Sequence, residues 1–560
     1  MAIGTAAEGS GSGEARTIRI HLPETASDTV NRIVEILARR VREYSGARVV
    51  TTGEGELAVH LAIKPGVGAE GFTISDEPSG GIRIEGNDEP GLLFGVGKFL
   101  RDASYTETEF TPGTWRGTSV PKKQVRGIYF ATHFLNYYHV CPIDEFTRYV
   151  EDLALWGLNT FSVWFDMHHF NGIDDPAAQA MLKRLRAILK TARELGLRTG
   201  LTTIADEGYA NSPVEMRADW TAGHDGYTTP PGGHYHVELC PNKPGAIELE
   251  LKWFRERFDA FKDIGIDYLW LWPYDQGGCT CSLCKPWGAN GFLRIAEPVA
   301  RLFREAFPNG KVVLSTWYFD HFTSGEWDGI TEAFNKNPPD WVDHVLADDI
   351  GGVPRYVLAK GVPGGKPLVG FPEISMYGMN PWGGFGANPM PERFQRLWDE
   401  AGAKLGGGFP YSEGIYEDIN KVLYARFYWD PEAKAADTVR EYIAFYFSPL
   451  AVDEVSRAIA ILERNHIHHV RDKDGRLHVQ MESTEGADES FRLMCSADAN
   501  LPQRARESWR WRILYLRAQI DSELRKSDGH IEGDAVSEAF AELTEIYHAQ
   551  NAGDWVRPPR

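Results

Sequence analysis

Acidic and aromatic residues follow nearly every apolar stretch between residues 126 and 413 of this chain. Carboxyl groups can transfer protons to and from a reacting group, and aromatic faces stack on the C–H faces of a sugar ring. A single carboxylate after one strand would be weak evidence, because helix caps use Asp in the same place. The repetition, with aromatic residues between the acids, indicates a carbohydrate site. The candidate substrate-binding residues are His133, Trp164, Asp166, Tyr274, Gln276, Trp317, Tyr377, Trp382 and Tyr411.

Glycoside hydrolysis needs two carboxyl groups, one protonated to assist the leaving group and one ionised. Asp275 follows the apolar stretch Tyr268–Trp272. Partial desolvation there would raise the pKa of Asp275 and suit a general acid. The alternative is that Asp275 only supports the Gly-rich turn that comes after it.

Three further acids are candidates for the second catalytic carboxylate. Glu373 follows the stretch Val369–Pro372 and is the first choice as base or nucleophile. Glu413 is its best alternative, although it could instead bind substrate hydroxyls. Asp348, with its neighbour Asp349, is also a catalytic candidate, but one member of such a pair often caps the following helix.

The cysteines form a second chemical pattern. Cys279, Cys281 and Cys284 lie in one short segment, and Cys240 ends the long segment after the preceding predicted strand. Adjacent strands would bring the four thiols together as ligands of a structural zinc ion, and the alternative is a set of reduced buried thiols. Zinc enclosed by four cysteines has no open position, so we expect no cofactor in catalysis. The His468–His469 pair is expected at the surface.

These residues need a scaffold that gathers strand ends in one place. From Val125 the chain alternates eight times between strand-like and helix-like stretches. This rhythm predicts an α/β fold with a (β/α)8 barrel over residues 124–430 and a site at the carboxyl ends of its strands. A doubly wound sheet is the alternative, but no phosphate-binding Gly loop follows the first strand. The predicted strands are Arg126–Thr132, Thr160–Asp166, Thr199–Ala205, Tyr268–Tyr274, Val312–Tyr318, His344–Asp348, Leu368–Ile374 and Gly406–Tyr411.

Two further units flank the predicted barrel. Residues 1–15 are expected to be a disordered tail, residues 16–120 a small α+β domain, and residues 431–560 a helical bundle. Pro112–Lys123 is rich in Pro, Gly, Thr and Lys and is predicted to be a linker. Apolar periodicity predicts strands at Thr17–His21, Leu57–Ile63, Gly71–Ser75 and Ile82–Glu85, and helices at Thr29–Tyr44, Gly91–Leu100, Glu145–Trp156, Gln179–Leu195, Ala435–Phe447, Ala451–Val470, Pro502–Arg525 and Ala535–Ala552.

Composition restricts the partners of the chain. It has 560 residues and a formal net charge of −20, whereas nucleic acids and anionic membranes bind clustered Lys and Arg. We therefore expect no nucleic-acid or membrane partner. The expected partner is a carbohydrate substrate, and a homodimer is possible. The N-terminus lacks the basic start and apolar core of a secretory signal, and six cysteines are too few for a disulfide scaffold, so a cytoplasmic location is expected.

Several segments resemble known glycosidases. Glu70–Ser75, Ile82–Asp88 and Gly91–Val96 resemble the N-terminal domain of α-glucuronidases and family 20 β-hexosaminidases, and Leu239–Pro244 and Asp275–Cys284 are similar to a bacterial α-glucuronidase-like branch. The resemblance implies a catalytic barrel with its acid after strand four, at Asp275, and with an Asp and a Glu after strands six and seven. The α-glucuronidases have Glu at the acid position. The hexosaminidases have an Asp-Glu pair where this chain has Asp275 and Gln276.

These observations together predict an exo-acting glycoside hydrolase that removes a terminal uronic acid or N-acetylhexosamine. Two alternatives stay open at this point. One is a barrel that binds carbohydrate without cleaving it, because the acid position lacks Glu. The other is a lyase or another sugar-modifying enzyme on the same scaffold.

Overall fold

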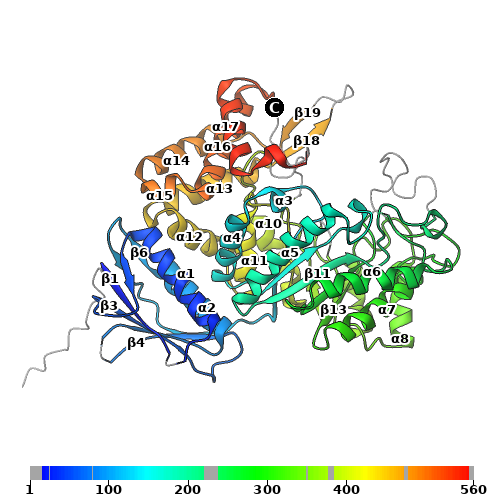
Figure 1. The fold of residues 1–560 in the computed structure, drawn as a ribbon. Coiled ribbons are helices and arrows are strands. Elements are labelled where there is room, and N and C mark those ends of the chain that lie inside the picture. The colour runs from blue at the N-terminus through cyan, green and yellow to red at the C-terminus, as the bar shows by residue number, and fades with distance from the viewer. Residues whose placement is uncertain are drawn as a thin grey trace, which may run out of the picture.

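The centre of the molecule is a closed parallel barrel (Figure 1). The computed structural model describes residues 16–23, 25–78, 80–219, 237–275, 277–348, 351–375, 384–471 and 477–553. The barrel closes because β9 pairs with both β10 and β16, and the short strand β17 (Tyr411–Ser412) pairs with β9 as well. The predicted (β/α)8 barrel is confirmed. Its strands are β9 (Val125–Phe130), β10 (Thr160–Trp164), β11 (Arg198–Ile204), β12 (Tyr268–Trp272), β13 (Lys311–Ser315), β14 (His344–Leu346), β15 (Leu368–Gly370) and β16 (Leu405–Gly408).

Each barrel strand begins within one residue of its predicted start but ends earlier than predicted. The predicted strand Val312–Tyr318, for example, stops pairing at Ser315. Tyr318 cannot belong to a strand because its φ is 51°, in the left-handed region that strands exclude. Apolar character therefore continues beyond the strands, and these extra residues form the loops at the carboxyl end of the barrel.

Aromatic side chains fill the inside of the barrel. The ring of Trp270 lies 4.9 Å from that of Phe371, 5.3 Å from Tyr129 and 5.6 Å from Phe409, measured between centroids. All four side chains are buried. The interior is thus a packed core, as in other barrels of this type, and its uppermost side chains form the floor of any site at the carboxyl end.

Helices cover the outside of the barrel. Most of them run between successive strands and are amphipathic, so their apolar faces pack on the sheet. The last of them, α11, is buried along nearly its whole length. The predicted helix Gln179–Leu195 begins earlier, because Asp175 caps it and Pro176 occupies its first turn. The helices are α4 (Ile143–Leu155), α5 (Pro176–Glu194), α6 (Ala246–Ala260), α7 (Gly291–Ala306), α8 (Glu326–Lys336), α9 (Arg355–Lys360), α10 (Pro391–Ala401) and α11 (Asp418–Trp429).

The N-terminal part is a six-stranded sheet with two helices packed on one face. The sheet order is β2-β1-β3-β5-β4-β8, and α2 (Glu89–Asp102) contacts both this sheet and α4 of the barrel. The predicted linker Pro112–Lys123 is wrong in part: β8 (Gly117–Ser119) pairs with β4 at the sheet edge. The polar composition of this segment gave no sign of a strand, because β8 is held by backbone pairing with β4 and not by apolar side chains. The remaining elements are β1 (Thr17–His21), α1 (Asp28–Ser45), β2 (Arg48–Val50), β3 (Leu57–Ile63), β4 (Phe72–Asp76) and β5 (Ile82–Gly86).

A buried ion-pair network joins this sheet to the barrel. The Glu70 carboxylate contacts the guanidinium of Arg126 at 2.5 Å and that of Arg198 at 2.7 Å, and it accepts a hydrogen bond from Asn159 at 2.9 Å. Burial alone would raise the pKa of Glu70, but the two guanidinium groups outweigh it and hold the pKa below its ordinary value. Both barrel arginines thus depend on a carboxylate from the N-terminal part.

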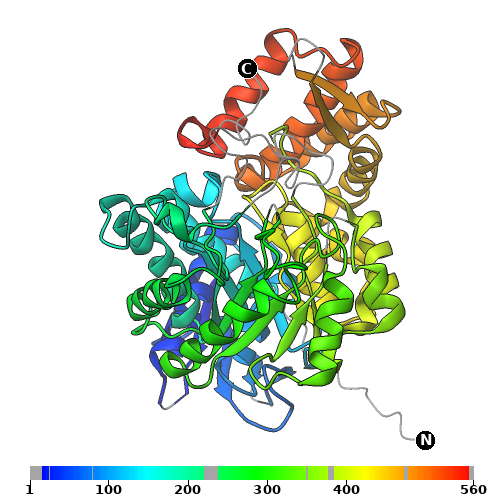
Figure 2. The same cartoon turned by 90° about the vertical axis from the view of Figure 1, so that its right-hand side faces the viewer.

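The C-terminal part is mostly helical, and Figure 2 shows it, in orange to red, towards the top of the molecule. The predicted helix Ala451–Val470 is wrong beyond α13 (Val452–Arg464), because β18 (Ile467–Arg471) pairs with β19 (Leu477–Met481), a partner that local periodicity does not reveal. The predicted helix Pro502–Arg525 is interrupted by the cap Ser508, and the helix α14 was not predicted. The other helices are α12 (Ala435–Tyr446), α14 (Ala487–Asn500), α15 (Gln503–Arg506), α16 (Trp509–Lys526) and α17 (Asp534–Ile546).

Arg510 connects the C-terminal helices to the rest of the chain. This buried side chain on α16 pairs with Asp418 of α11 at 2.8 Å and with Asp152 of α4 at 3.0 Å, and Asp152 also pairs with Arg40 of α1. Each of the three parts of the chain therefore supplies a charge to one buried network.

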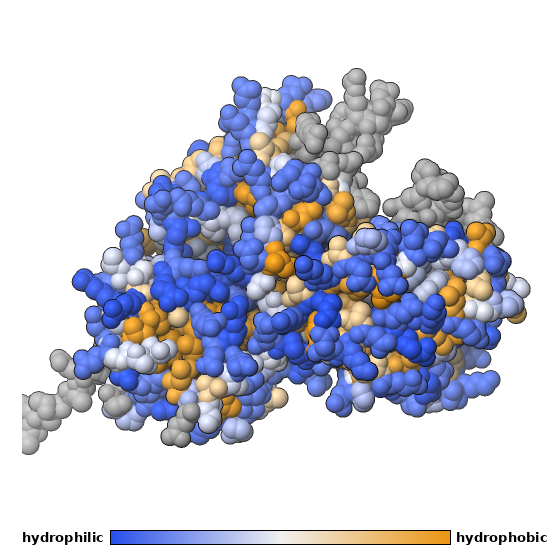
Figure 3. All heavy atoms as spheres, viewed as in Figure 1, coloured by the Kyte–Doolittle hydropathy of each residue, from blue (hydrophilic) through white to orange (hydrophobic). Residues whose placement is uncertain are grey.

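The face of the molecule in Figure 3 is mostly hydrophilic, with small and separate apolar patches. Within the described ranges, no helix is long and apolar enough to cross a membrane. The side chains of His468 and His469, expected at the surface, lie outside the described side chains.

The Glu70 network makes a testable contribution to stability. Arg126→Ala would leave Glu70 buried with one cation fewer, and we expect a loss of about 3–5 kcal/mol in the free energy of unfolding. Arg301→Ala is the control, since Arg301 pairs with Glu297 on the exposed face of α7 and should leave stability unchanged. Chemical denaturation followed by Trp fluorescence measures both variants. Equal effects of the two substitutions would contradict this role for the network.

Candidate active site

The residues that follow the barrel strands gather at the carboxyl end of the barrel, called here the mouth. The structure buries almost all of the predicted site residues that it describes, and Asp275 alone among the candidate catalytic acids is half-buried. Gln276, Tyr377 and Trp382 lie outside the described residues. The buried ones are His133, Trp164, Asp166, Tyr274, Trp317, Asp348, Glu373, Tyr411 and Glu413.

Stacked aromatic rings form the floor of the mouth. Trp272 stacks on Trp317 with centroids 5.0 Å apart, and His133 stacks on Trp164 at 4.5 Å. The indole N–H groups of Trp272 and Trp317 have no acceptor among the residues that the structure describes. Tyr129 lies beneath His133, and its hydroxyl and the His133 Nδ1 are 2.6 Å apart. Flat aromatic faces of this kind can stack on the C–H faces of a sugar ring.

The charges of several acids of the mouth act on the phenol of Tyr129. Burial raises its pKa well above the ordinary value, and the charges of Asp166, Asp275, Glu413 and Glu207 raise it further. These four acids follow strands β10, β12, β17 and β11. The charges of acids that follow four different strands thus act on one buried phenol inside the barrel.

Glu373 and Glu413 lie on neighbouring strand ends. A bridge pairs Glu373 with Tyr411, and the backbone N–H of Ser375 donates to Glu373 Oε1 at 2.8 Å. The Tyr411 hydroxyl donates to Glu413 Oε1. Burial raises the pKa of Glu413 well above its ordinary value, and the charges of Glu417 and Glu373 add to this. Glu413 is therefore held in its protonated form more strongly than a free glutamic acid.

Asp275 lies across the ring from these two acids. It follows β12, which is three strands from β15, the strand before Glu373, and four strands from β16, the barrel strand that precedes the Glu413 segment. The charge of Asp275 also raises the pKa of Glu238, after burial and the charges of Asp206 and Cys279. The mouth thus has carboxyl groups on opposite sides, separated by the aromatic floor.

Two predicted site residues have structural contacts instead of facing the floor. The Tyr274 hydroxyl donates to Glu326 Oε2 at 2.7 Å, at the start of α8, and to the backbone oxygen of Tyr318 at 3.0 Å. Asp348 Oδ2 accepts the backbone N–H of Phe371 at 3.0 Å and so links β14 to the end of β15.

Two further acids belong to the mouth and are absent from the predicted set. Glu207 accepts hydrogen bonds from the indole of Trp164 at 3.0 Å and from the backbone of Met167 at 2.6 Å, so it fixes the strand-two residues. Glu238 is fully buried, pairs with Glu207 through a backbone bridge, and has no hydrogen-bond partner for its carboxylate among the described residues. Glu207 follows a predicted strand and could have been chosen, but nothing local in the sequence places Glu238 here.

The C-terminal helices reach the mouth at the Glu413 side. The Tyr547 hydroxyl donates to the backbone oxygen of Glu413 at 2.8 Å, and its ring packs against Gly414. Gly553 N donates to the oxygen of Leu135 at 2.7 Å, in the loop after β9. The loop that carries Glu413 is therefore supported by a helix distant in sequence.

Two groups of side chains at the mouth are close enough to share a metal ion. Asp166, His168 and His169 form one group, and the four cysteines form the other. In the first group His168 Nδ1 contacts Asp166 Oδ1 directly, and His169 Nε2 lies 3.6 Å from Asp166 Oδ2. Asp166 also acts on Glu207, because burial and then the charge of Asp166 raise the pKa of Glu207 well above its ordinary value.

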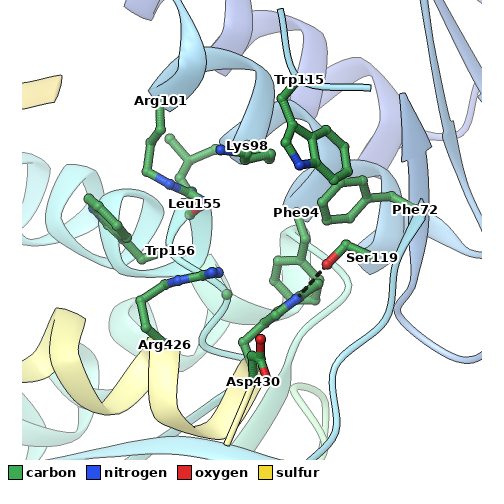
Figure 4. Close-up of a pocket in the computed structure, with 12 residues that line it drawn as sticks. Phe72, Phe94, Lys98, Arg101, Trp115, Ser119, Leu155, Trp156, Arg426 and Asp430 are labelled. Carbon is green, nitrogen blue, oxygen red and sulfur yellow. Dashed lines mark hydrogen bonds between the residues drawn. The ribbon is translucent and has the colours of Figure 1, made fainter. Parts of the chain in front are cut away.

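A cavity of about 240 Å³ lies between the N-terminal sheet and α11 (Figure 4). Gly157, which precedes β10, is part of its wall, so it opens at the amino ends of the strands. Its cations Lys98, Arg101 and Arg426 contact Glu441. Burial would raise the pKa of Glu441, but these cations lower it to about 2. The cavity is therefore not a candidate sugar site, because its charges are paired and it lies at the amino ends of the strands.

No protein-family model matches the chain, and no curated protein matches its sequence. Its fold is shared with solved glycoside hydrolases. A family 115 4-O-methyl-α-glucuronidase with specificity for decorated arabinogalactans covers 98% of this chain and 78% of its own, at TM-score 0.63 and 11% identity. The family 20 β-N-acetylhexosaminidase from Streptomyces coelicolor A3(2) covers 81% and 93%, at TM-score 0.52 and 15% identity.

A family 89 glycoside hydrolase from Clostridium perfringens, solved with its substrate GlcNAc-α-1,4-galactose, gives TM-score 0.63 at 11% identity. The match includes 92% of this chain and 65% of the family 89 enzyme. At such identities the likeness establishes the fold: a parallel barrel with flanking domains that glycoside hydrolases also have. The resemblance read from the sequence pointed to the first two of these families.

The raised pKa of Glu413 predicts a pH dependence of stability. Protonated Glu413 stabilises the native state fully below its ordinary pKa of 4.5, and this contribution is lost as the pH rises through the raised native pKa. A tenfold change in the proton affinity of a group corresponds to about 1.4 kcal/mol of free energy. Glu413→Gln, which is neutral at every pH, should therefore gain stability relative to the native chain as the pH rises.

Melting curves of both proteins between about pH 5 and about pH 9 measure this difference. Glu432→Gln is the control, because Glu432 is exposed and its substitution should leave the pH dependence unchanged. A stability difference between Glu413→Gln and the native chain that stays constant over this range would show that Glu413 is ionised throughout.

Proposed function

We propose that this chain is an exo-acting glycoside hydrolase that removes a terminal uronic acid or N-acetylhexosamine from an oligosaccharide or glycoside. The observation that carries the proposal is the set of acids that follow the barrel strands at one end of the barrel, namely Asp166, Glu207, Asp275 and Glu413, around a floor of stacked aromatic rings. The shared fold supports it, because solved enzymes with this fold act on glucuronides and on N-acetylated sugars.

Asp275 takes the role of general acid. Proton transfer to the leaving oxygen needs an acid that a bound glycoside can reach, and Asp275 is the one candidate catalytic carboxyl among the described residues that keeps partial exposure. Its strand β12 is separated from β15, which precedes Glu373, by β13 and β14, so a sugar on the floor would lie between Asp275 and Glu373. The two carboxyl groups of a glycosidase must flank the scissile bond in this way.

Glu373 takes the role of the ionised partner. Its Oε1 accepts a backbone N–H from Ser375, a contact that stabilises the charged form of a carboxylate. Glu413 is less suited as base or nucleophile, because its raised pKa favours the protonated form. A protonated Glu413 can still hold a sugar hydroxyl and position Tyr411, whose hydroxyl it accepts.

The aromatic floor suits the binding of the sugar ring. The stacked rings of Trp317 and Trp272, with those of Trp164 and Tyr411, form an apolar surface beneath the proposed sugar. A cytoplasmic location fits the cysteines, all six of which are unpaired. Four neighbouring thiols would be exposed to oxidation in a secretory compartment.

A panel of nitrophenyl glycosides tests the proposed activity. The panel contains uronic, N-acetylated and neutral sugars in both anomeric forms, and we expect hydrolysis of a uronide or an N-acetylhexosaminide. The stereochemistry of the product then distinguishes retention from inversion. Binding of a sugar without hydrolysis would instead support a carbohydrate-binding barrel. This is the alternative suggested by Asp275, which stands where the α-glucuronidases have Glu.

Asp275→Asn tests the role of the proposed acid. The substitution keeps the size of the side chain but removes its proton, so we expect turnover of the best glycoside to fall by about 100-fold or more. Asp328→Asn on the outer face of α8 is the matched control and should keep full activity. Activity of the Asp275→Asn variant near that of the control would move the acid role to another residue, with Glu413 the first to examine.

A further inference from the structure

The four cysteines of the mouth converge from two loops. Cys240 Sγ lies 3.6 Å from Cys284 Sγ and 3.9 Å from Cys281 Sγ, and the sulfur atoms of all four, Cys279 included, lie within 4.8 Å of one another. Four thiolates around one zinc ion, each about 2.3 Å from it, form a tetrahedron with edges of about 3.8 Å. The observed arrangement thus has the size of a tetrahedral site.

Hydrogen-bond donors point at the sulfur atoms. The backbone N–H of Asp219 donates to Cys279 Sγ at 3.3 Å, and the side-chain amide of Asn242 donates to Cys284 Sγ at 3.1 Å. Asp219 is itself fixed, since Lys243 Nζ lies 2.6 Å from its carboxylate and Thr280 N donates to its backbone oxygen at 2.7 Å. Thiols packed only as small apolar groups need no such donors, whereas metal-bound thiolates accept them as outer-shell contacts.

We propose that Cys240, Cys279, Cys281 and Cys284 bind one zinc ion as a structural site. Four thiolates in a tetrahedron are the ligand set that zinc favours, and they leave no position open for water or substrate. The ion therefore takes no part in the reaction.

The proposed zinc ion would fix both loops beside Asp275. Cys240 N donates to Met216 O at 2.8 Å, which places the first ligand on the loop after β11. The other three follow Asp275, and their loop packs on Trp287, where a Cβ on Gly278 would lie 2.3 Å from the ring. Trp287 Nε1 in turn donates to Pro273 O at 2.8 Å. Asp275 thus lies in a segment held at Pro273 and at the cysteines.

Metal analysis of the purified chain and two pairs of cysteine variants test the site. We expect about one zinc ion per native chain, and a loss of at least about 80% of it in Cys279→Ser and Cys281→Ser, since each removes a thiolate. Cys141→Ser and Cys495→Ser are matched controls, because these are the two cysteines outside the cluster, and they should keep the metal. Zinc retained by both cluster variants, or iron in place of zinc, would overturn the proposal.

A second measurement on the native chain does not depend on variants that fold poorly. The metal is removed with a chelator under reducing conditions and Co²⁺ is added, which should give the absorption bands of tetrahedral cobalt bound to thiolates. Removal should also speed amide hydrogen exchange in residues 277–284 while β14 and β15 stay protected. A reduced chain that takes up neither Zn²⁺ nor Co²⁺ would end the proposal.

Discussion

The closed barrel packed with aromatic side chains is the constraint on which the rest of the structure depends. Trp270 touches Tyr129, Phe371 and Phe409, so side chains from four strands share one centre. Because the interior is full, nothing can bind inside the barrel, and the parallel direction of the strands sends every loop that follows a strand to the same end. The position of the acids therefore follows from the closure of the sheet.

Gathering acids on such a floor has an electrostatic consequence. Buried carboxyl groups that lie near one another resist ionisation. Burial and the charges of neighbouring carboxylates raise the pKa of both Glu207 and Glu413. An acid and a base on one site need environments that differ. Here the burial differs, because Glu373 and Glu413 are buried and Asp275 is half-buried. Glu413 accepts a hydroxyl, Glu373 accepts a backbone N–H, and Asp275 keeps contact with solvent.

The sequence predicted those strands whose positions are decided by local hydrophobic periodicity. Strands Thr17–His21 and Leu57–Ile63 match β1 and β3 in both bounds, and the starts of the barrel strands match to within one residue, because hydrophobic periodicity decides them. What the sequence missed depends on strand pairing: the edge strand β8 needs β4, much earlier in the chain, and β18 needs β19, the next strand along the chain. At the site, Asp275, Glu373 and Glu413 follow strands and could be chosen, whereas Glu238 could not, since a long loop returns it to Glu207.

The two sides of the mouth are held in place by different contacts, the C-terminal helices on one side and the thiol cluster on the other. Strand pairing ends at Trp272 and at Ser412, so the sheet itself reaches neither Asp275 nor Glu413. On the Glu413 side the C-terminal helices supply the contact, through Tyr547. On the Asp275 side the thiol cluster and Trp287 hold the segment from within the barrel's own loops. Glu373, the proposed partner of Asp275, belongs to the Glu413 side because a backbone bridge joins it to Tyr411. A proposed acid and its partner must keep their separation to within a fraction of an ångström, so a rigid site needs both supports.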